Sequence, residues 1–280
     1  MIDLHTHSTA SDGTLSPAKL LAKAEEVGLS AIALTDHDTV SGLPMFLKTA
    51  ADSSVEAIPG VEIAASWYGG SLHIVGLFID YENSKLGTML TTIRHNRDLR
   101  NRKIFKKLHD LGVGITEEEL EAAAGDHVVG RPHFAAALTT KGICETSRQA
   151  FGRYLGREGA AYVPRYLPMP AETIKAIHGA GGLAIWAHPA GGPQAAQPAK
   201  IRKPARHLKK LGLDGIEMLY PDHSESDCKT IRKIGEELDL AFSGGSDFHG
   251  DNMPGIELGT GRGNLLVPDE FLQTLTRISY

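Results

Sequence analysis

The sequence predicts an α/β barrel that is interrupted by a small helical subdomain. Short apolar runs alternate with helical patterns over the first 80 residues, and this alternation returns between residues 171 and 243. The stretch between these parts, from about residue 84 to residue 153, is rich in charged helical patterns and holds no convincing strand. Repeated strand and helix units favour a parallel sheet or barrel. A single barrel with a helical insertion therefore explains the whole chain of 280 residues.

The elements of the first half follow from apolar runs and helix signals. Ser16 and Pro17 offer a cap and a first-turn proline, and Gly28 offers a stop. They predict a helix over 19–27, and the apolar pattern predicts a second helix over 41–51. We predict strands over 2–5, 31–35, 55–58 and 72–78.

The insertion and the second half follow in the same way. Predicted helices of the insertion cover 86–111, 117–124, 131–141 and 146–155. Beyond it we predict helices over 171–180, 199–211 and 225–238, and strands over 183–187, 215–219 and 240–243. The Gly, Pro, Ala and Gln content of 191–204 favours a surface loop. We assign 1–83 and 166–280 to the barrel and 84–165 to the insertion, which we expect to contribute to the substrate site.

Composition and charge exclude several classes of function. A net charge of −5 argues against duplex DNA as a partner, and no apolar run approaches the roughly 20 residues of a membrane helix. Cys144 and Cys228 lie far apart and in no CxxC pair, so neither a disulfide framework nor a cysteine zinc site is expected. The start of the chain has no leader pattern, which favours a cytoplasmic location. No obligate protein partner is evident.

Histidines and acids follow the predicted strands in a recurring way. In a barrel, the loops after the carboxyl ends of parallel strands converge on one mouth. Each such residue alone is more often a hydrogen-bonded or helix-capping group, but many unpaired polar groups at one mouth would be costly. Bound metals would satisfy them, and mixed imidazole and carboxylate ligands suit Mn²⁺, Zn²⁺ or Fe²⁺. The nine candidate ligands are His5, His7, Asp12, His37, Glu62, His73, His188, Asp247 and His249.

The chain resembles the PHP (polymerase and histidinol phosphatase) superfamily in six successive motifs. They are Asp-Leu-His-Thr-His-Ser from residue 3, Ser-Asp-Gly from 11, Thr-Asp-His-Asp from 35, Pro-Gly-Val-Glu from 59, Ala-His-Pro from 187 and Ser-Asp-Phe-His from 246. The resemblance implies a distorted (β/α)7 barrel with three divalent metals. It implies one metal on His5, His7, Glu62 and Asp247, a second on Glu62, His73 and His188, and a third on Asp12, His37 and His249.

Motifs of the insertion resemble a narrower group of bacterial PHP phosphoesterases that act on nucleotides. They are Gly-Arg-Pro-His-Phe-Ala from residue 130, Ala-Phe from 150, Tyr-Leu-Gly from 154 and Ala-Tyr-Val-Pro from 161. That group includes 3′,5′-nucleoside bisphosphate phosphatases and 5′-to-3′ exoribonucleases. Arg131 could bind phosphate in a bidentate way or pair with a carboxylate. His133 could contact the same phosphate or cap a helix, and His223 is a third candidate for phosphate contact.

The resulting hypothesis is hydrolysis of a nucleotide phosphomonoester by a metal-bound water, with no side-chain nucleophile. The preferred substrate is the 3′-phosphate of a 3′,5′-nucleoside bisphosphate. The alternatives are a 5′-to-3′ exoribonuclease on short RNA, a histidinol-phosphate phosphatase and a non-catalytic PHP module. A metal-bound water, His223 and Asp36 stay open as the acid for the leaving group. The basic run of Arg94, Arg97, Arg100, Arg102, Lys103, Lys106 and Lys107 could contact RNA or form a solvated helix face.

Overall fold

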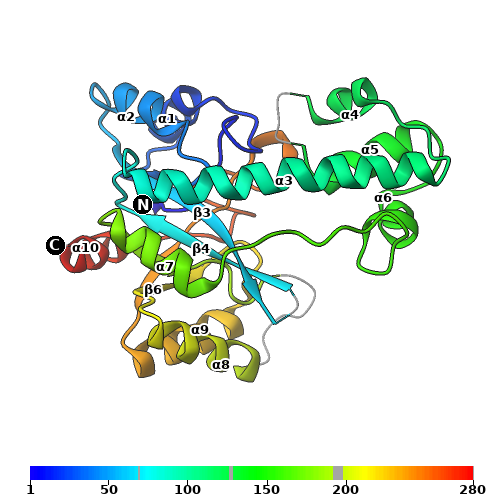
Figure 1. The fold of residues 1–280 in the computed structure, drawn as a ribbon. Helices are drawn as coiled ribbons and strands as arrows, with labels where there is room; N and C mark the ends of the chain where they lie inside the picture. The colour runs from blue at the N-terminus through cyan, green and yellow to red at the C-terminus, as the bar shows by residue number, and fades with distance from the viewer. Residues whose placement is uncertain (69, 126–128, 192–197, 280) are drawn as a thin grey trace. The chain divides into compact units, whose positions relative to one another are not determined.

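The chain folds as a mixed α/β protein around a nearly closed barrel of seven strands (Figure 1). This computed structural model describes residues 1–68, 70–125, 129–191 and 198–279. The strands follow one another around the sheet in chain order. They are β1 (Ile2–Asp3), β2 (Ala31–Leu34), β3 (Glu56–Trp67), β4 (Gly70–Leu77), β5 (Leu183–Trp186), β6 (Gly215–Leu219) and β7 (Ala241–Gly244).

The two ends of the sheet meet through main-chain hydrogen bonds. The amide of Leu4 donates to the carbonyl of Gly244 over 3.1 Å, and the amide of Asp247 donates to the carbonyl of His5 over 2.8 Å. The segment after β1 therefore runs beside the segment after β7. This contact brings residues from opposite ends of the sequence to one rim of the barrel.

The barrel is not parallel throughout, contrary to the expectation from repeated strand and helix units. Strands β1 to β3 and β5 to β7 pair in parallel, but β4 is antiparallel to both β3 and β5. Strand β3 is also much longer than the predicted 55–58. Pro59 still pairs with β2, whereas Gly60 begins the antiparallel pairing with β4. A Cβ at Gly60 would lie 2.8 Å from Thr35 Cγ2 and 2.9 Å from the Gly76 carbonyl oxygen, so only glycine fits at this change of partner.

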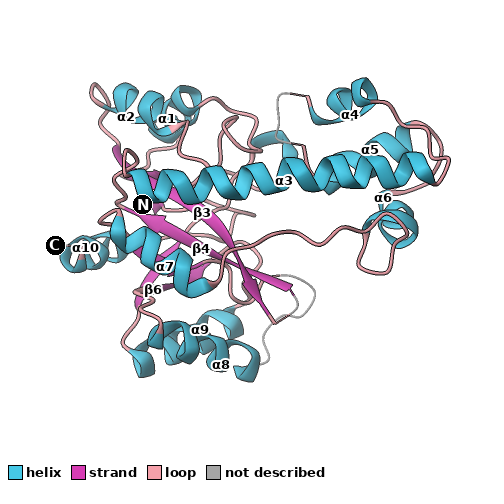
Figure 2. Ribbon diagram, in the orientation of Figure 1, coloured by secondary structure: helices cyan, strands magenta, loops and turns pink. Residues whose placement is uncertain are grey.

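Contact clustering divides the chain into two compact units, 1–90 with 167–280, and 91–166. The first unit holds the barrel and a core of buried side chains that includes Ile2, Ile58 and Val267. Outside its strands, α7 packs on β3 to β5 and α9 on β6 and β7 (Figure 2). Its helices are α1 (Pro17–Glu26), α2 (Leu43–Ala50), α7 (Pro170–Gly179), α8 (Pro198–Lys210), α9 (Glu225–Leu238), the 3₁₀ turn η2 (Gly250–Asn252) and α10 (Asp269–Ile278).

The second unit is helical and has a separate core that includes Ile104, Phe134 and Leu138. The long helix α3 (Ser84–Asp110) begins in the first unit and continues into this one. The other elements are α4 (Glu117–Ala124), α5 (Arg131–Thr140), α6 (Ser147–Ala150) and the π-helix η1 (Phe151–Leu155). A contribution of this unit to the substrate site stays a prediction.

Three predicted elements differ from the structure. Residues 198–204 were expected in a surface loop but form the first turns of α8, while 192–197 lie outside the described residues. The expected helix over 146–155 is a short α-helix followed by a π-helical turn. Helix α10 was not predicted, although Asp269 and Glu270 mark its first turn. No helix of the described chain is both long and apolar enough to cross a membrane.

Candidate metal centre

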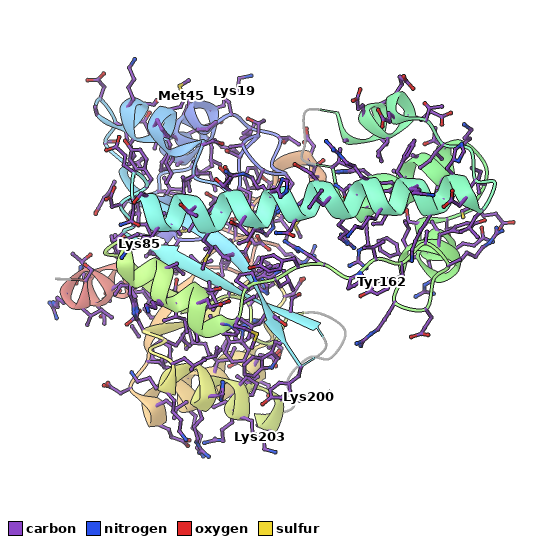
Figure 3. The ribbon with its side chains drawn as sticks, viewed as in Figure 1. Lys19, Met45, Lys85, Tyr162, Lys200 and Lys203 are labelled. Carbon is purple, nitrogen blue, oxygen red and sulfur yellow. The ribbon has the colours of Figure 1, made fainter. Side chains whose placement is uncertain are left out.

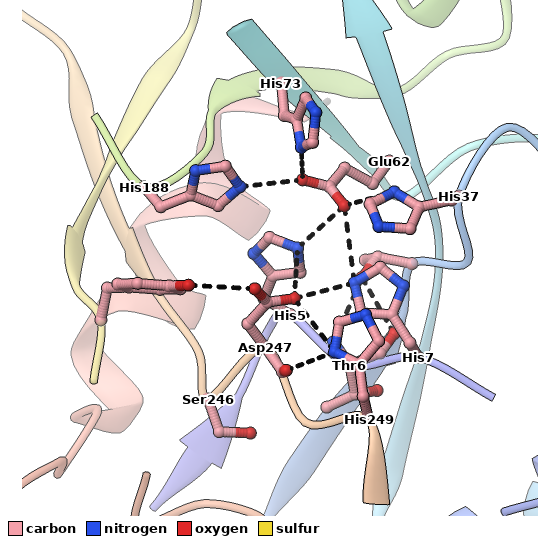
Figure 4. Close-up of polar contacts among 12 residues, drawn as sticks. His5, Thr6, His7, His37, Glu62, His73, His188, Ser246, Asp247 and His249 are labelled. Atoms are coloured by element: carbon pink, nitrogen blue, oxygen red, sulfur yellow. Dashed lines mark hydrogen bonds and ion pairs between the residues drawn. The ribbon is translucent and has the colours of Figure 1, made fainter. Parts of the chain in front are cut away.

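The nine candidate ligands come together at the rim of the barrel (Figure 4). His5 and His7 follow β1, and His37 follows β2. Glu62 and His73 lie within β3 and β4 rather than after them. His73 reaches the rim because β4 runs against its neighbours, so its early residues lie where the other strands end. The remaining four are Asp12 in the turn after β1, His188 after β5, and Asp247 and His249 after β7.

Glu62 lies at the centre of the cluster and is fully buried. One carboxylate oxygen, Oε1, lies 2.8 Å from His73 Nδ1 and 3.1 Å from His188 Nε2. The other, Oε2, lies 2.8 Å from His37 Nδ1, and Nε2 of His5 and of His7 lie within 3.5 Å of it. A single carboxylate thus touches ligands from five segments of the barrel.

Three overlapping groups place their donor atoms within 4.8 Å of one another. One group matches the first implied metal set in full. The second adds His7 to the implied third set, and the last joins His37 to Glu62 and His73, while His188 contacts Glu62 directly. The groups are His5, His7, Glu62 and Asp247; His7, Asp12, His37 and His249; and His37, Glu62 and His73.

Several buried ligand atoms in this cluster make no hydrogen bond within the described chain. They are His5 Nε2, both ring nitrogens of His7, Glu62 Oε2 and Asp247 Oδ1. A buried polar atom without a partner costs about 1–3 kcal/mol. These atoms face one another, and a divalent cation would satisfy them together. The donor set therefore fits metal ions that accept both nitrogen and oxygen ligands.

The protonation states also suit metal binding, which requires neutral imidazole and ionised carboxylate. Burial, together with His249 and His37, lowers the pKa of His7 to about 3. Burial alone would raise the pKa of Glu62, but the surrounding histidines, His37 foremost, hold it well below its usual value. Burial likewise opposes charge on His5, yet the carboxylate of Glu217 and its acidic neighbours raise the pKa of His5 above its ordinary value.

Two of the candidate ligands stand on backbone that non-glycine residues rarely adopt. The φ angles of His188 and Asp247 are 32° and 53°. Such conformations cost free energy of order 1–3 kcal/mol and persist where the surrounding structure requires them. Here they turn both side chains into the cluster directly after β5 and β7.

Glu217 in β6 supports two of the ligands and was missed by the sequence reasoning. Its Oε1 lies 3.0 Å from His5 Nδ1, and its Oε2 accepts a hydrogen bond of 2.6 Å from the amide of His188. A carboxylate on the far nitrogen of a ligand histidine fixes the ring and its tautomer. A signal was present, because a glutamate inside an otherwise apolar, buried strand needs a partner. Tyr220, also missed, donates its hydroxyl to Asp247 Oδ2 over 3.1 Å.

Two further candidates are engaged in holding the loops around the cluster. The Asp36 carboxylate accepts hydrogen bonds from the amide and hydroxyl of Ser8 and from the hydroxyl of Ser11. His223 is buried, with Nδ1 3.0 Å from the Met218 carbonyl and Nε2 accepting from the amide of Ala190. In this conformation both ring nitrogens of His223 bind main chain.

Arg131 and His133 belong to the helical unit, at the start of α5. Arg131 Nη1 donates to the Leu155 carbonyl over 3.3 Å, and its guanidinium lies 5.7 Å from the Phe151 ring centroid. His133 Nδ1 accepts from the amide of Gly130, so this nitrogen caps the helix.

The basic run of α3 divides between surface and interior. Arg100 is only 6% exposed, its Nε donates to the Val163 carbonyl, and its Nη2 is buried without a hydrogen-bond partner in the described chain. Burial and the nearby cations Arg131, Arg165 and Arg97 lower the pKa of Arg100 to about 10. Arginines that gather around a buried guanidinium form a candidate anion site, which the run of charges alone did not reveal.

Comparison with known proteins places these observations among phosphoesterases. Residues 3–129 match the PHP domain model. A 5′-3′ exoribonuclease of Haemophilus influenzae is 37% identical over 88% of this chain and 89% of its own length. A 3′,5′-nucleoside bisphosphate phosphatase of Chromobacterium violaceum is 32% identical over 92% of this chain and 90% of its own. A solved structure from Bifidobacterium adolescentis, assigned as a metal-dependent phosphoesterase, superposes with a TM-score of 0.81 at 27% identity and covers 99% of this chain and 95% of its own.

Proposed function

Because this chain belongs to the PHP family and is a metal-dependent hydrolase of phosphate esters, we propose that it cleaves the 3′-phosphate ester of 5′-phosphorylated nucleotides. The first proposed substrates are 3′,5′-nucleoside bisphosphates. The observation that carries the proposal is the set of buried, unpartnered nitrogen and oxygen atoms around Glu62. All nine candidate ligands hold competent side chains, which argues against a non-catalytic module.

We propose three divalent cations, with Mn²⁺ first and Zn²⁺ or Fe²⁺ as alternatives. One would bind His5, His7, Glu62 and Asp247; a second Glu62, His73 and His188; and a third Asp12, His37 and His249. When bound, such cations activate water as the nucleophile and neutralise charge on the phosphoryl group. The protein then needs no nucleophilic side chain.

The protein's own residues position the ligands and the substrate. Glu217 holds His5 and the backbone of His188, and Tyr220 orients Asp247. Arg131 and the buried Arg100 would receive an anionic group of the substrate, with His133 beside them at the start of α5. The hydrogen bonds of Asp36 and His223 lead us to propose loop-positioning roles for both, in place of acid catalysis or phosphate contact.

A second candidate reaction is 5′-to-3′ hydrolysis of short RNA. It is favoured by the 37% identical exoribonuclease of Haemophilus influenzae and a 34% identical one of Salmonella typhimurium. The two reactions break the same bond, between phosphorus and the 3′-oxygen of a nucleotide that carries a 5′-phosphate. They differ in the leaving fragment, which is phosphate in one case and 5′-phosphorylated RNA in the other.

A substrate comparison with purified protein tests the proposal. The substrates are a 3′,5′-nucleoside bisphosphate, a 5′-mononucleotide, a 5′-phosphorylated short RNA and histidinol phosphate, each with Mn²⁺ and with a chelator. We expect hydrolysis of the bisphosphate and the RNA, loss of activity on chelation and recovery with Mn²⁺. Fastest turnover of histidinol phosphate, or activity that ignores the chelator, would overturn the assignment.

Substitution of Arg131 tests the proposed anion site. Arg131→Ala should lower kcat/KM for the bisphosphate by about 1.5–4 kcal/mol, the range for a charged hydrogen-bond partner in a closed site. Lysine should recover only part of this loss, because a point charge cannot make a bidentate contact. Metal content should not change. Equal kcat/KM for wild type and Arg131→Ala would remove this residue from the substrate site.

A further inference from the structure

Three aromatic rings meet at the tip of the hairpin formed by β3 and β4. Trp67 ends β3, and its ring centroid lies 4.8 Å from that of Tyr68 and 5.4 Å from that of His207 in α8. Tyr68 is 89% exposed, although apolar rings of this size are usually at least partly covered. Its φ of 34° is a conformation that bulky residues rarely adopt. The hairpin thus holds an aromatic ring out in solvent at some cost in strain.

Helix α8 presents a row of cations beside these rings. Lys203, Arg206, His207 and Lys210 follow the i, i+3, i+4, i+7 pattern and share one exposed face, which Lys200 extends by one turn (Figure 3). The helix contains no acidic residue. Its other cations, Arg202 and Lys209, bind Glu237 and the Asp239 carbonyl at the end of α9. The face that carries His207 is therefore strongly positive on a chain whose net charge is −5.

The same hairpin connects this surface to the metal centre. Glu62 lies in β3, and His73 in β4 pairs with Ala64. Trp67 is three residues beyond Ala64, a distance of roughly 10 Å at about 3.3 Å per residue. Successive nucleotides of an extended single strand, at several ångströms each, would span this separation in two or three units. Both surfaces belong to the barrel unit.

We propose that Trp67, Tyr68, His207 and the cationic face of α8 bind single-stranded RNA downstream of the nucleotide held at the metal centre. Aromatic rings beside a positive groove are the usual means of binding single strands, with bases stacked on the rings and phosphates along the cations. An anionic vesicle or an acidic peptide would use the cations but not need exposed rings in stacking positions. The inference rests on the proposed function for the placement of the RNA 5′ end.

The test compares substrates of different length on the metal-loaded enzyme. Tyr68→Ala and the double variant Lys203→Glu with Arg206→Glu should each lower kcat/KM for a 5′-phosphorylated pentanucleotide at least about fivefold, since one stacked base is worth about 5- to 100-fold in affinity. The same variants should keep kcat/KM for a 3′,5′-nucleoside bisphosphate within about twofold of wild type, because the smaller substrate ends before the hairpin tip. Tyr68→Phe, which keeps the ring, should behave as wild type.

A matched control changes the same charge elsewhere on the barrel unit. Lys19→Glu with Lys85→Glu alters two exposed lysines on α1 and α3, and it should leave both kcat/KM values near wild type. If the control lowers pentanucleotide cleavage as much as the α8 variant, the effect is one of net charge and the RNA surface is refuted. Equal losses on both substrates would refute it as well.

Binding separates failure of this surface from failure of the proposed function. Fluorescence anisotropy of a labelled, slowly cleaved phosphorothioate pentanucleotide should give a salt-dependent affinity, and the α8 variant should lower the slope of log K against log salt by about one. RNA binding that needs Tyr68 would support the surface even if the bisphosphate is not hydrolysed. Hydrolysis of the bisphosphate without Tyr68-dependent binding, or equal binding of a poly-glutamate peptide or anionic vesicles, would overturn the surface alone.

Discussion

Glu62 joins ligands from several strands through two oxygen atoms. Glu62→Gln keeps the shape but removes the negative charge that two neighbouring cations would share. We expect kcat/KM to fall at least about a hundredfold, together with a loss of bound metal. Elemental analysis and steady-state kinetics measure both quantities. Glu56→Gln makes the same change at the exposed start of β3 and should have neither effect. A Glu62 variant that retains its metal and its activity would remove Glu62 from the ligand set.

Glu217 should matter for a different reason, because it uses both oxygens as acceptors. Glutamine at this position replaces one acceptor by a donor, so either His5 Nδ1 or the amide of His188 loses its partner. We expect metal affinity or kcat/KM to fall about 10- to 100-fold, with the fold intact by circular dichroism. Wild-type metal affinity in Glu217→Gln would show that His5 and His188 are held by the main chain alone.

The sequence identified side chains that follow strands but not those that act from within them. The nine candidate ligands stand in motifs with recognisable spacing, and the structure brings all nine to one rim. Glu217 lies in the middle of a strand, where the apolar pattern alone offered no reason to connect it with a histidine more than 200 residues away. Arg100 was hidden in a run of charges, because helix periodicity cannot show which cation a tertiary contact will bury.

At the scale of elements, apolar runs located all seven strands, but the extent of β3 could not be predicted. Pro59 and Gly60 resemble the end of a strand, since proline lacks an amide donor and glycine weakens a strand interior. In the fold they mark the point where β3 exchanges its parallel partner for an antiparallel one. The exchange depends on long-range pairing with β4, which period-two patterns do not encode. The antiparallel direction of β4 was missed for the same reason.

The junction between β7 and the first strand leaves no room for a side chain at Gly245. A Cβ there would lie 2.4 Å from His5 Cβ and 2.5 Å from the His5 nitrogen. Gly245→Ala should therefore displace His5 and destabilise the protein by about 1–3 kcal/mol, a usual cost of overpacking. Urea unfolding and metal titration should both detect the change. Gly179→Ala, where a Cβ meets nothing within 4 Å, is the matched control. Unaltered metal affinity in Gly245→Ala would show that this contact relaxes freely.

At the scale of the molecule, the two units have separate hydrophobic cores, and the candidate metal ligands all belong to one of them. Metal that binds only the folded barrel stabilises it by about 2.7 kcal/mol at a free concentration one hundred times Kd. Chelation should therefore speed hydrogen exchange in barrel peptides and leave the core of 91–166 unchanged. Mass spectrometry of exchanged peptides measures this. Equal deprotection of both cores would show that the units unfold as one.

The closure of the barrel also sets the time at which the enzyme can first act during its own synthesis. His5 and His7 leave the ribosome early, whereas Asp247 and His249 are made near the end, about 12–48 s later at roughly 5–20 residues per second. Until then the nascent chain holds an incomplete ligand set around Glu62. If the protein hydrolyses RNA as proposed, a chain still tethered to its messenger lacks the residues needed to cleave it.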